Sequence, residues 1–232
     1  MAGNIYLIPT PISEEGYGHL PEISKELITE LELYFVENQK NSRKFIKMLH
    51  PEAVIDNLEF VDIGKYSDKD LIQEGLQKVW LGNNAAILSD VGCPGIGDPG
   101  HELILEAQDS GVRIIPLAGP NSFMMALMAS GLNGQEFRFH GYLPIDKNQR
   151  KAKLKSMSAD VIKTGESQIF MDTPYRNQQV LSDIIQSCPA NVNLCIAEEI
   201  TGKKESILTM SVKDWKKINK KIDKHPVVFI LG

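Results

Sequence analysis

The segment Ser89–Gly100 carries the residue types best suited to hold a small ligand. It is written SDVGCPGIGDPG and contains four glycines, two prolines and two aspartates. Glycine lets backbone amides approach a ligand without a Cβ in the way, and carboxylates accept hydrogen bonds or pair with a cation. A ligand with a ribose diol, a cationic centre and an amino-acid end would suit this mixture. S-adenosylmethionine has all three features.

Two other interpretations of this segment are open. The stretch Gly95–Gly100 matches the dinucleotide pattern GxGxxG, but three features argue against NAD or FAD. Five residues separate Ser89 from the first glycine of the pattern, Pro99 removes an amide, and no acidic residue ends the next strand. The other interpretation is a tight crossover turn with no ligand, although twelve such residues are more than a turn needs.

Two further loops have a similar composition. Residues 8–12, IPTPI, follow the first predicted strand, and residues 116–122, PLAGPNS, combine a Gly-Pro turn with Asn121 or Ser122 as a helix N-cap. Parallel strands end at the same edge of a sheet, where α/β proteins bind ligands. If the three strands are neighbours, we expect the three loops to form one site.

The first half of the chain alternates predicted strands with predicted helices, which favours an α/β fold with a mostly parallel sheet. The predicted strands are residues 4–8, 33–36, 85–89 and 112–116. The predicted helices are residues 21–32, 41–49, 69–81, 100–110 and 121–130.

After Gly119 we predict more strands and fewer helices, typical of a mixed α+β domain. The predicted strands are residues 137–141, 168–172, 192–198, 206–210 and 227–231. The third and fourth of these lie close enough in sequence to pair antiparallel. We therefore expect an N-terminal α/β domain over residues 1–117 and a C-terminal mixed α+β domain over residues 118–232, with a ligand between them.

Composition limits the class of protein. The 232 residues have 25 Lys+Arg and 30 Asp+Glu, a net charge of −5, which argues against a basic nucleic-acid coat. Three cysteines without a CxxC pair or zinc spacing favour a reducing cytoplasm and no metal. The first residues show no signal-peptide pattern, and no apolar run is long enough for a membrane span.

The charge is unevenly distributed along the chain. Residues 14–37 hold seven acids and one lysine, a net −6. Residues 146–155 hold five bases and one acid (+4), and residues 203–224 hold eight lysines and three acids (+5). These segments are either solvated helix faces or, in the second half, a cationic surface for a polyanion.

Six segments, in order, resemble the tetrapyrrole methylase superfamily: IPTPI, SDVGCPGIGDPG, PLAGPNS, SGL followed by FRFHGYLP, FMDTPYR and CIAEEITGKKE. Within it the chain is most similar to the branch that methylates a cytidine 2′-hydroxyl in small-subunit ribosomal RNA. The match covers nearly the whole chain. The resemblance implies a two-domain tetrapyrrole-methylase-like fold, S-adenosylmethionine as methyl donor, ribosomal RNA or the small ribosomal subunit as partner, and a homodimer.

The resemblance also implies roles for individual residues. The cofactor would contact residues of both domains: Ile8, Pro9, Asp90, Gly92, Cys93, Asn121, Ser122, Met171, Asp172, Ala197 and Pro226. On the substrate side the chain departs from the usual pattern. Where relatives resemble AEDTRHTRKLL this chain has VENQKNSRKFI, Tyr175 stands where histidine is usual, and residues 65–68 replace a His-Asn-Glu patch. A tetrapyrrole or other small metabolite as acceptor, and a non-catalytic binding module, are therefore kept as alternatives.

Methyl transfer from a sulfonium needs alignment of the nucleophile and acceptance of its proton. Glu37, after the second predicted strand, is the candidate base; the alternative is an acid favoured by a helix N-terminus. Lys40, Arg43, Tyr175 and Arg176 are the candidate substrate-binding residues. Two groups are predicted to lie in the core, namely His140 and the methionines Met124, Met125 and Met128.

Overall fold

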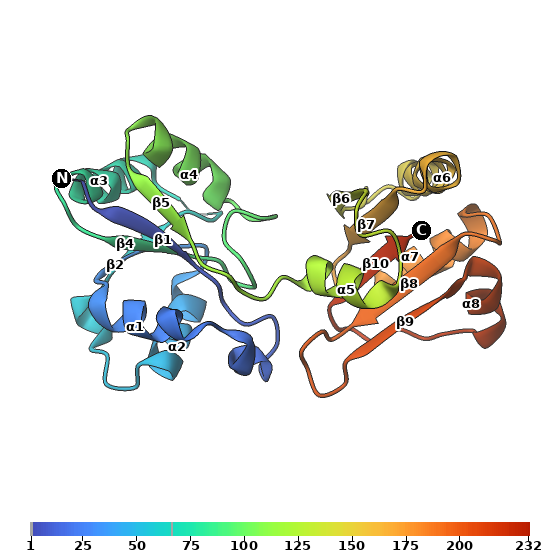
Figure 1. The fold of residues 1–232 in the computed structure, drawn as a ribbon, viewed down its shortest axis with the longest axis horizontal. Coiled ribbons are helices and arrows are strands. Elements are labelled where there is room, and N and C mark those ends of the chain that lie inside the picture. Colours follow the sequence, from blue (N-terminus) through green and yellow to red (C-terminus); the bar gives the residue numbers. More distant parts are fainter. Residues whose placement is uncertain (1, 66) are drawn as a thin grey trace. The chain divides into compact units, whose positions relative to one another are not determined.

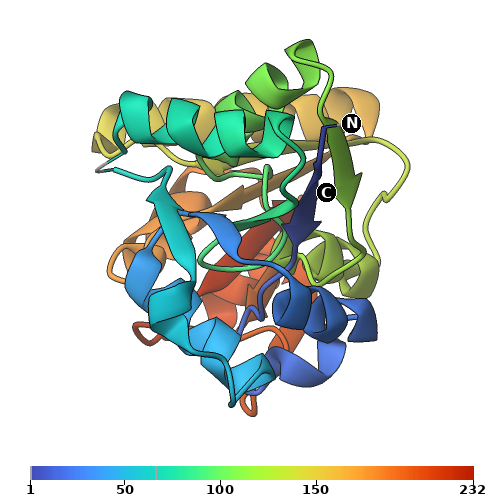
Figure 2. The ribbon, with the colours of Figure 1, turned by 90° about the vertical axis from the view of Figure 1, so that its left-hand side faces the viewer.

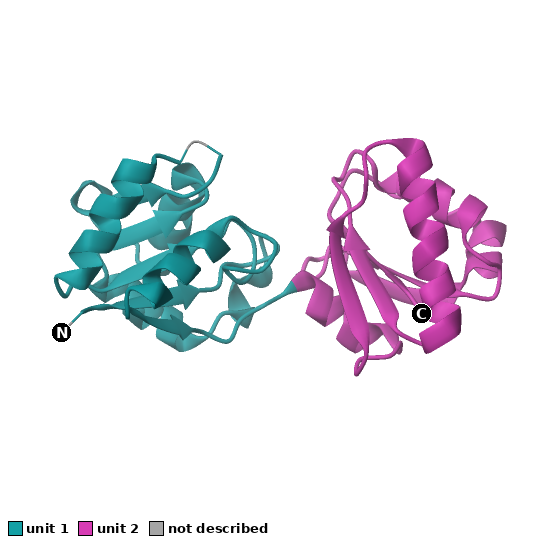
Figure 3. Cartoon of the chain, turned by 90° about the horizontal axis from the view of Figure 1, so that it is seen from above, with its two compact units in different colours: residues 1–121 teal, residues 122–232 magenta. Residues whose placement is uncertain are grey.

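A computed structural model describes every residue except Met1 and Tyr66. The second of these falls in the segment 65–68 and lies outside the described residues. The chain forms two compact units, Met1–Asn121 (unit 1) and Ser122–Gly232 (unit 2), coloured separately in Figure 3. Each unit has its own sheet and its own hydrophobic core.

Unit 1 is built on a parallel five-stranded sheet with the order β3-β2-β4-β1-β5. All side chains of β2 and β4 are buried, as expected for inner strands of a sheet covered on both faces. The strands are β1 (Asn4–Ile8), β2 (Leu33–Val36), β3 (Glu59–Asp62), β4 (Ala85–Leu88) and β5 (Arg113–Pro116). The predicted parallel sheet is confirmed, and the edge strand β3 was not predicted because it is short and only half-buried.

Helices cover both faces of this sheet. One core joins α1 and α2 to the face that includes Ile8 and Tyr34, and a second joins α3 and α4 to the face that includes Ile5 and Phe35. Figures 1 and 2 show the two helix pairs on opposite sides of the strands. The bounds are α1 (Glu22–Glu30), α2 (Gln39–Leu49), α3 (Lys69–Trp80) and α4 (Gly100–Asp109), with short 3-10 helices η1 (Gly16–His19) and η2 (Ile55–Asn57).

Unit 2 contains a mixed five-stranded sheet with the order β6-β7-β10-β8-β9. β6 and β7 are parallel, and the remaining neighbours are antiparallel, including the predicted pair β8 and β9. The strands are β6 (Phe137–Tyr142), β7 (Ser167–Met171), β8 (Asn193–Glu198), β9 (Ser206–Ser211) and β10 (Val227–Leu231). The predicted mixed α+β architecture is confirmed.

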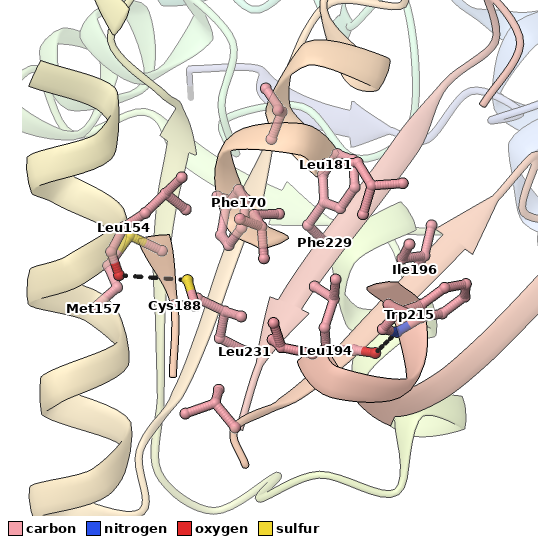
Figure 4. Close-up of a cluster of buried hydrophobic side chains, with 14 of the residues drawn as sticks. Leu154, Met157, Phe170, Leu181, Cys188, Leu194, Ile196, Trp215, Phe229 and Leu231 are labelled. Atoms are coloured by element: carbon pink, nitrogen blue, oxygen red, sulfur yellow. Dashed lines mark hydrogen bonds between the residues drawn. The ribbon is translucent and has the colours of Figure 1, made fainter. Parts of the chain in front are cut away.

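Unit 2 contains α5 (Ser122–Ser130), α6 (Lys147–Thr164), α7 (Asn177–Ser187) and α8 (Val212–Ile218). Of the helices in this half, α5 was predicted and α6, α7 and α8 were not. The lysine-rich sequence of α6 obscures its apolar stripe, formed by Leu154, Met157 and Val161 at helical spacing. This stripe packs with α7, α8 and one face of the sheet, and Figure 4 shows the resulting core around Phe170 and Phe229.

The methionines of α5 also differ from the prediction. Met128 is 81% exposed and Met124 is 37% exposed, whereas Ala126 and Leu127 are buried. The helix is apolar on all sides, so composition could not tell which positions face the sheet. His140 in β6 fits its prediction better, because its Nε2 lies 2.7 Å from Gln168 Oε1 and burial lowers the pKa of its imidazole.

Candidate functional site

Three loops meet at the carboxyl-end edge of the unit 1 sheet. They follow β4, β1 and β5, which are adjacent in the sheet. The loops after β1 and β4 are joined by two backbone hydrogen bonds. The Thr10 amide donates to the Gly92 carbonyl at 2.9 Å, and the Gly92 amide donates to the Thr10 carbonyl at 3.2 Å. The predicted convergence of the three strand-end loops is therefore present.

The loop after β5 is held against the other two loops. A Cβ added to Gly119 would lie only 2.2 Å from Pro9 Cβ, so the backbone passes directly over the proline ring. The Cys93 thiol donates to the Pro120 carbonyl at 3.4 Å, and burial raises the pKa of this thiol. Position 119 needs glycine because Pro9 leaves no space for a side chain there.

Replacing Gly119 by alanine should therefore disturb the junction between these loops. We expect unit 1 to lose about 1–3 kcal/mol of unfolding free energy, the usual cost of inserting a methyl group into a packed site. Hydrogen exchange of the β1 and β5 amides would measure the loss. The matched control is Gly18→Ala, because nothing lies within 4 Å of a Cβ there. Equal exchange in the two variants would contradict the close approach seen at Gly119.

The loop after β4 is shaped by glycines and one aspartate. Gly92, Gly95 and Gly97 have φ angles of 81°, 81° and 74°, a conformation that residues with a Cβ rarely adopt. Asp98 Oδ1 accepts hydrogen bonds from the amides of Gly95 and Gly100 at 2.8 and 2.9 Å. This arrangement fixes the loop and leaves a backbone surface that a ligand can approach closely.

Glu37, which directly follows β2, lies beside this loop. Its Oε2 accepts a hydrogen bond from the Asp90 amide at 3.1 Å. The cap of α2 is instead the side chain of Asn38, which accepts from the Lys40 and Asn41 amides. Glu37 therefore holds the loop after β4. It also directly precedes the N-cap Asn38, so its position fits the alternative of an acid favoured by a helix N-terminus as well.

The carboxylates around Glu37 raise its proton affinity. Burial is the largest cause of its raised pKa, and the negative charges of Asp90, Asp98 and Asp62 add to it. The pKa of Asp90 is also raised, first by burial and then by Asp62, while a hydrogen bond with Asn41 opposes the shift. A carboxylate with a raised pKa close to a ligand loop suits a proton acceptor.

A pocket of about 220 Å³ lies next to Asp90. Its lining comes from the loops after β1 and β4, from η1 and from the start of α2, and includes Thr10, Ile12, Tyr17, Asn41, Phe45 and Asp90. Asp90 Oδ1 is buried and has no hydrogen-bond partner. A buried acceptor without a donor indicates that a ligand or water completes the site.

The candidate substrate residues of α2 lie outside this pocket. Lys40 is exposed in the first turn, and the Arg43 guanidinium lies 5.2 Å from the centre of the Phe60 ring on β3. Lys44, a basic residue of α2 that was not predicted, does line the pocket. Within unit 1, Ile8 and Pro9 are buried, and Cys93 is half-buried.

The candidate residues of unit 2 include an ion pair at the end of β7, in which the Asp172 side chain is fully buried and the Arg176 side chain is partly exposed. Arg176 Nε donates to Asp172 Oδ1 at 2.6 Å, and the Thr173 amide donates to the same oxygen at 2.6 Å. Asp172 Oδ2 and Arg176 Nη1 are buried without partners. Arg176, predicted to bind substrate, is thus mainly bound to Asp172.

The remaining unit 2 candidates surround the ends of β8 and β10. Ala197 is buried in β8 opposite Val228 of β10, and Pro226 directly precedes β10. Pro226 accepts a backbone hydrogen bond from Glu199, whose φ angle is 46°. Met171 ends β7 and is half-buried.

Sequence reasoning missed several residues that build these sites. Asp62 was missed because β3 was not predicted. Thr10 and Asn41 lie in segments that the sequence marks, residues 8–12 and 36–46, but their contacts depend on the tertiary structure. Asp98 could have been singled out, since Asp-Pro-Gly before a helix is a common turn and helix-start sequence. In the part of the chain that the structure describes, no group of His, Cys, Asp and Glu could hold a metal ion. Among the same residues, no helix has the length and apolarity to cross a membrane.

Solved structures share this fold. The methyltransferase CobJ aligns over 99% of this chain and 94% of its own, with a TM-score of 0.64 and 16% identity. Uroporphyrin-III C-methyl transferase from Thermus thermophilus, solved with S-adenyl homocysteine, aligns over 99% and 97%, with a TM-score of 0.59 and 15% identity. The chain matches no protein-family model. Its architecture is the tetrapyrrole methylase fold.

Sequence relatives identify the family within this fold. Ribosomal RNA small subunit methyltransferase I from Bacillus subtilis is 30% identical over 213 residues, 91% of this chain and 68% of that protein. The protein of the same name from Vibrio cholerae is 28% identical over 210 residues, 90% of this chain and 69% of that protein. The chain belongs to the ribosomal RNA small subunit methyltransferase I family, and it is a methyltransferase.

Proposed function

We propose that this protein transfers a methyl group from S-adenosylmethionine to the 2′-hydroxyl of a cytidine in small-subunit ribosomal RNA. The observation that supports it most is the set of three interlocked loops, with a buried, unpaired Asp90 oxygen and the adjacent Glu37 carboxylate. Family membership supports the acceptor, because the relatives are named for ribosomal RNA of the small subunit.

The residues of the site fit the proposed cofactor. Positive-φ glycines after β4 expose backbone at a loop, and buried acceptors at Asp90 and Asp172 lack donors that a ligand could supply. When bound, S-adenosylmethionine supplies a methyl group on a sulfonium, which is an already activated leaving group. The residues proposed to hold it are Ile8, Pro9, Asp90, Gly92, Cys93, Asn121 and Ser122, with Met171, Asp172, Ala197 and Pro226 from the second half of the chain.

The chain's own residues then have to align the acceptor and take its proton. A ribose hydroxyl is a poor nucleophile near neutral pH, so a nearby base lowers the barrier. Glu37 is the proposed base, because its pKa is raised and one of its oxygens is positioned by the Asp90 amide. Lys40, Arg43, Tyr175 and Arg176 are the proposed substrate contacts, with Arg176 acting through its pair with Asp172.

We further propose a homodimer in the cytoplasm. Family resemblance and the unpaired cysteines are the support for these two properties. Light scattering coupled to size-exclusion chromatography measures the oligomeric state, and a monomeric mass at micromolar concentration would contradict the dimer.

The function is tested by transfer of a labelled methyl group. Purified protein, labelled S-adenosylmethionine and small subunits from cells lacking the gene should give labelled RNA, and mapping of 2′-O-methyl marks should place the label at one cytidine. A matched control uses small subunits from wild-type cells, which should accept little label because the position is already methylated. Labelled tetrapyrroles or other small metabolites with unlabelled RNA would contradict the proposed acceptor.

A further inference from the structure

Unit 2 presents an exposed aromatic ring with a cation placed beside it. Tyr175 follows β7 and is 80% exposed. The Lys224 ammonium, from the loop between α8 and β10, lies 5.3 Å from the centre of this ring. Proteins that bind single-stranded nucleic acids combine exposed aromatic rings, on which bases stack, with nearby cations that contact the phosphates.

The backbone next to Tyr175 is held by the ion pair between Arg176 and Asp172. Arg176, the next residue, pairs with Asp172, and the Arg176 amide donates to the Thr173 carbonyl at 2.9 Å. The Asp172 side chain has no exposed surface in this pair. The backbone on either side of Tyr175 is therefore fixed, although its ring lies in solvent.

The loop that carries Lys224 is held by side chains of α7, the helix that follows Arg176. Gln178 Oε1 accepts from the Ile222 amide at 2.7 Å, and the Asn177 side chain donates to the His225 carbonyl at 2.8 Å. Ile222 is buried in the core of unit 2. The first turn of α7 thus fixes the loop that carries Lys224, and the Arg176–Asp172 pair fixes the backbone next to Tyr175, which gives a pre-formed surface.

The charge of this loop favours an anion. Lys221 and Lys224 are exposed, and neither has a carboxylate partner among the described residues. Lys220 is bound to Glu198 at 2.6 Å, so it neutralises that buried acid. Asp223 is the one exposed acid between the two free lysines. Lys224 is the lysine that lies beside the Tyr175 ring, so the two residues offer one stacking face and one phosphate contact.

We infer that Tyr175 and Lys224 form a subsite for one nucleotide of single-stranded RNA, with the base stacked on Tyr175 and an adjoining phosphate on Lys224. The inference rests on the proposed function, because it supplies a binding subsite for that RNA substrate. A flat base has a π-face whatever its sequence, so the subsite would add affinity and position the strand, while the choice of the methylated cytidine is made elsewhere.

The test is binding of the full-length protein to a short fluorescent single-stranded RNA, measured by anisotropy over a range of salt concentrations. Tyr175→Ala should weaken binding about 5- to 100-fold, the effect of losing one stacked base. Tyr175→Phe should bind like the unmodified protein because it keeps the ring. Lys224→Ala should reduce the slope of log affinity against log salt by about 0.7, the value for one phosphate contact on a single strand.

The matched control is Lys163→Ala. Lys163 is exposed in the last turn of α6, just before β7 begins, whereas Tyr175 follows the end of β7. Its removal should change neither affinity nor salt slope. Thermal unfolding of each variant checks folding. RNA affinity that is unchanged in both Tyr175→Ala and Lys224→Ala, or equally reduced in Lys163→Ala, would overturn the subsite.

Methyl-transfer assays separate this inference from the proposed function. If both hold, Tyr175→Ala raises KM for RNA by the factor measured in binding, with little change in kcat. Transfer to RNA with an unchanged KM in Tyr175→Ala would overturn the subsite and leave the function. Tyr175-dependent RNA binding without any methyl transfer to RNA would support the subsite and contradict the function.

Discussion

Replacing Glu37 by glutamine is expected to lower kcat for methyl transfer to RNA by about 10²- to 10⁴-fold, the usual contribution of a general base. Glutamine has the same shape, and its side-chain oxygen can still accept the hydrogen bond from the Asp90 amide. The variant therefore removes the proposed proton acceptor and keeps the contact that holds the loop after β4. Binding of S-adenosylhomocysteine, measured by calorimetry, should stay close to that of the unmodified protein.

The same residue predicts the pH dependence of the reaction. Burial and the neighbouring Asp90, Asp98 and Asp62 raise the pKa of Glu37 above the ordinary value of about 4.3. As the pH falls through this raised pKa the carboxylate takes up a proton, so kcat should fall on the acid side and be restored as the pH rises. In Glu37→Gln this acid limb should disappear from the residual activity.

A second variant, Glu37→Ala, distinguishes a general base from a carboxylate that only holds the loop. Glu37→Ala removes both the carboxylate and the hydrogen bond to the loop, so it should lower kcat and also weaken S-adenosylhomocysteine binding. A kcat in Glu37→Gln within about threefold of the unmodified protein would show that the carboxylate only holds the loop. An acid limb that persists in Glu37→Gln would assign the titration to another group, with Asp90 first because its pKa is also raised.

The sequence predicted the sites best where local composition marks a loop. The segments after β1, β4 and β5 were recognisable because Gly and Pro end strands and shape turns. The contacts between these loops were not recognisable from the sequence, because the Thr10–Gly92 pairing and the close approach of Gly119 to Pro9 depend on the strand order in the sheet. The sheet order β3-β2-β4-β1-β5 places loops from distant parts of the chain together, and no local pattern contains it.

Side-chain partners were predicted less well than loops. Arg176 was predicted to bind substrate, but its guanidinium is bound to Asp172. Lys224 was noticed only as part of a positive segment, and its position over the Tyr175 ring follows from the hydrogen bonds that α7 makes to its loop. Charge counts along a sequence give the sign of a region, whereas the partner of each charge is set by tertiary structure.

The partner of Arg150 could not be predicted from charge counts either, and its loss is expected to have a large effect on stability. It is one of the five bases in the positive segment 146–155, yet its side chain is 4% exposed. Its Nε and Nη2 donate to Asp183 Oδ2 at 2.9 and 2.7 Å. Its Nη1 donates to the carbonyls of Pro144 and Ile145 at 3.1 and 2.8 Å, so it anchors the loop after β6 to α7.

Asp183→Ala should therefore lower the unfolding free energy of unit 2 by about 3–5 kcal/mol, because the arginine charge stays buried without its partner. Urea unfolding in a Trp80→Phe background measures the loss, because the remaining Trp215 is 2% exposed in unit 2 and its fluorescence reports that unit. The matched control is Lys217→Ala, which breaks the exposed pair with Asp214 and should cost far less than Asp183→Ala, because solvent screens that pair.

A double variant distinguishes a buried unpaired charge from a simple loss of packing. Arg150→Met with Asp183→Leu removes both charges and fills the space with apolar atoms, so it should be more stable than Asp183→Ala. Recovery should be incomplete, because the carbonyls of Pro144 and Ile145 lose their donor. If the double variant is no more stable than Asp183→Ala, the destabilisation comes from lost packing or from the freed loop after β6, and the buried charge is not its cause.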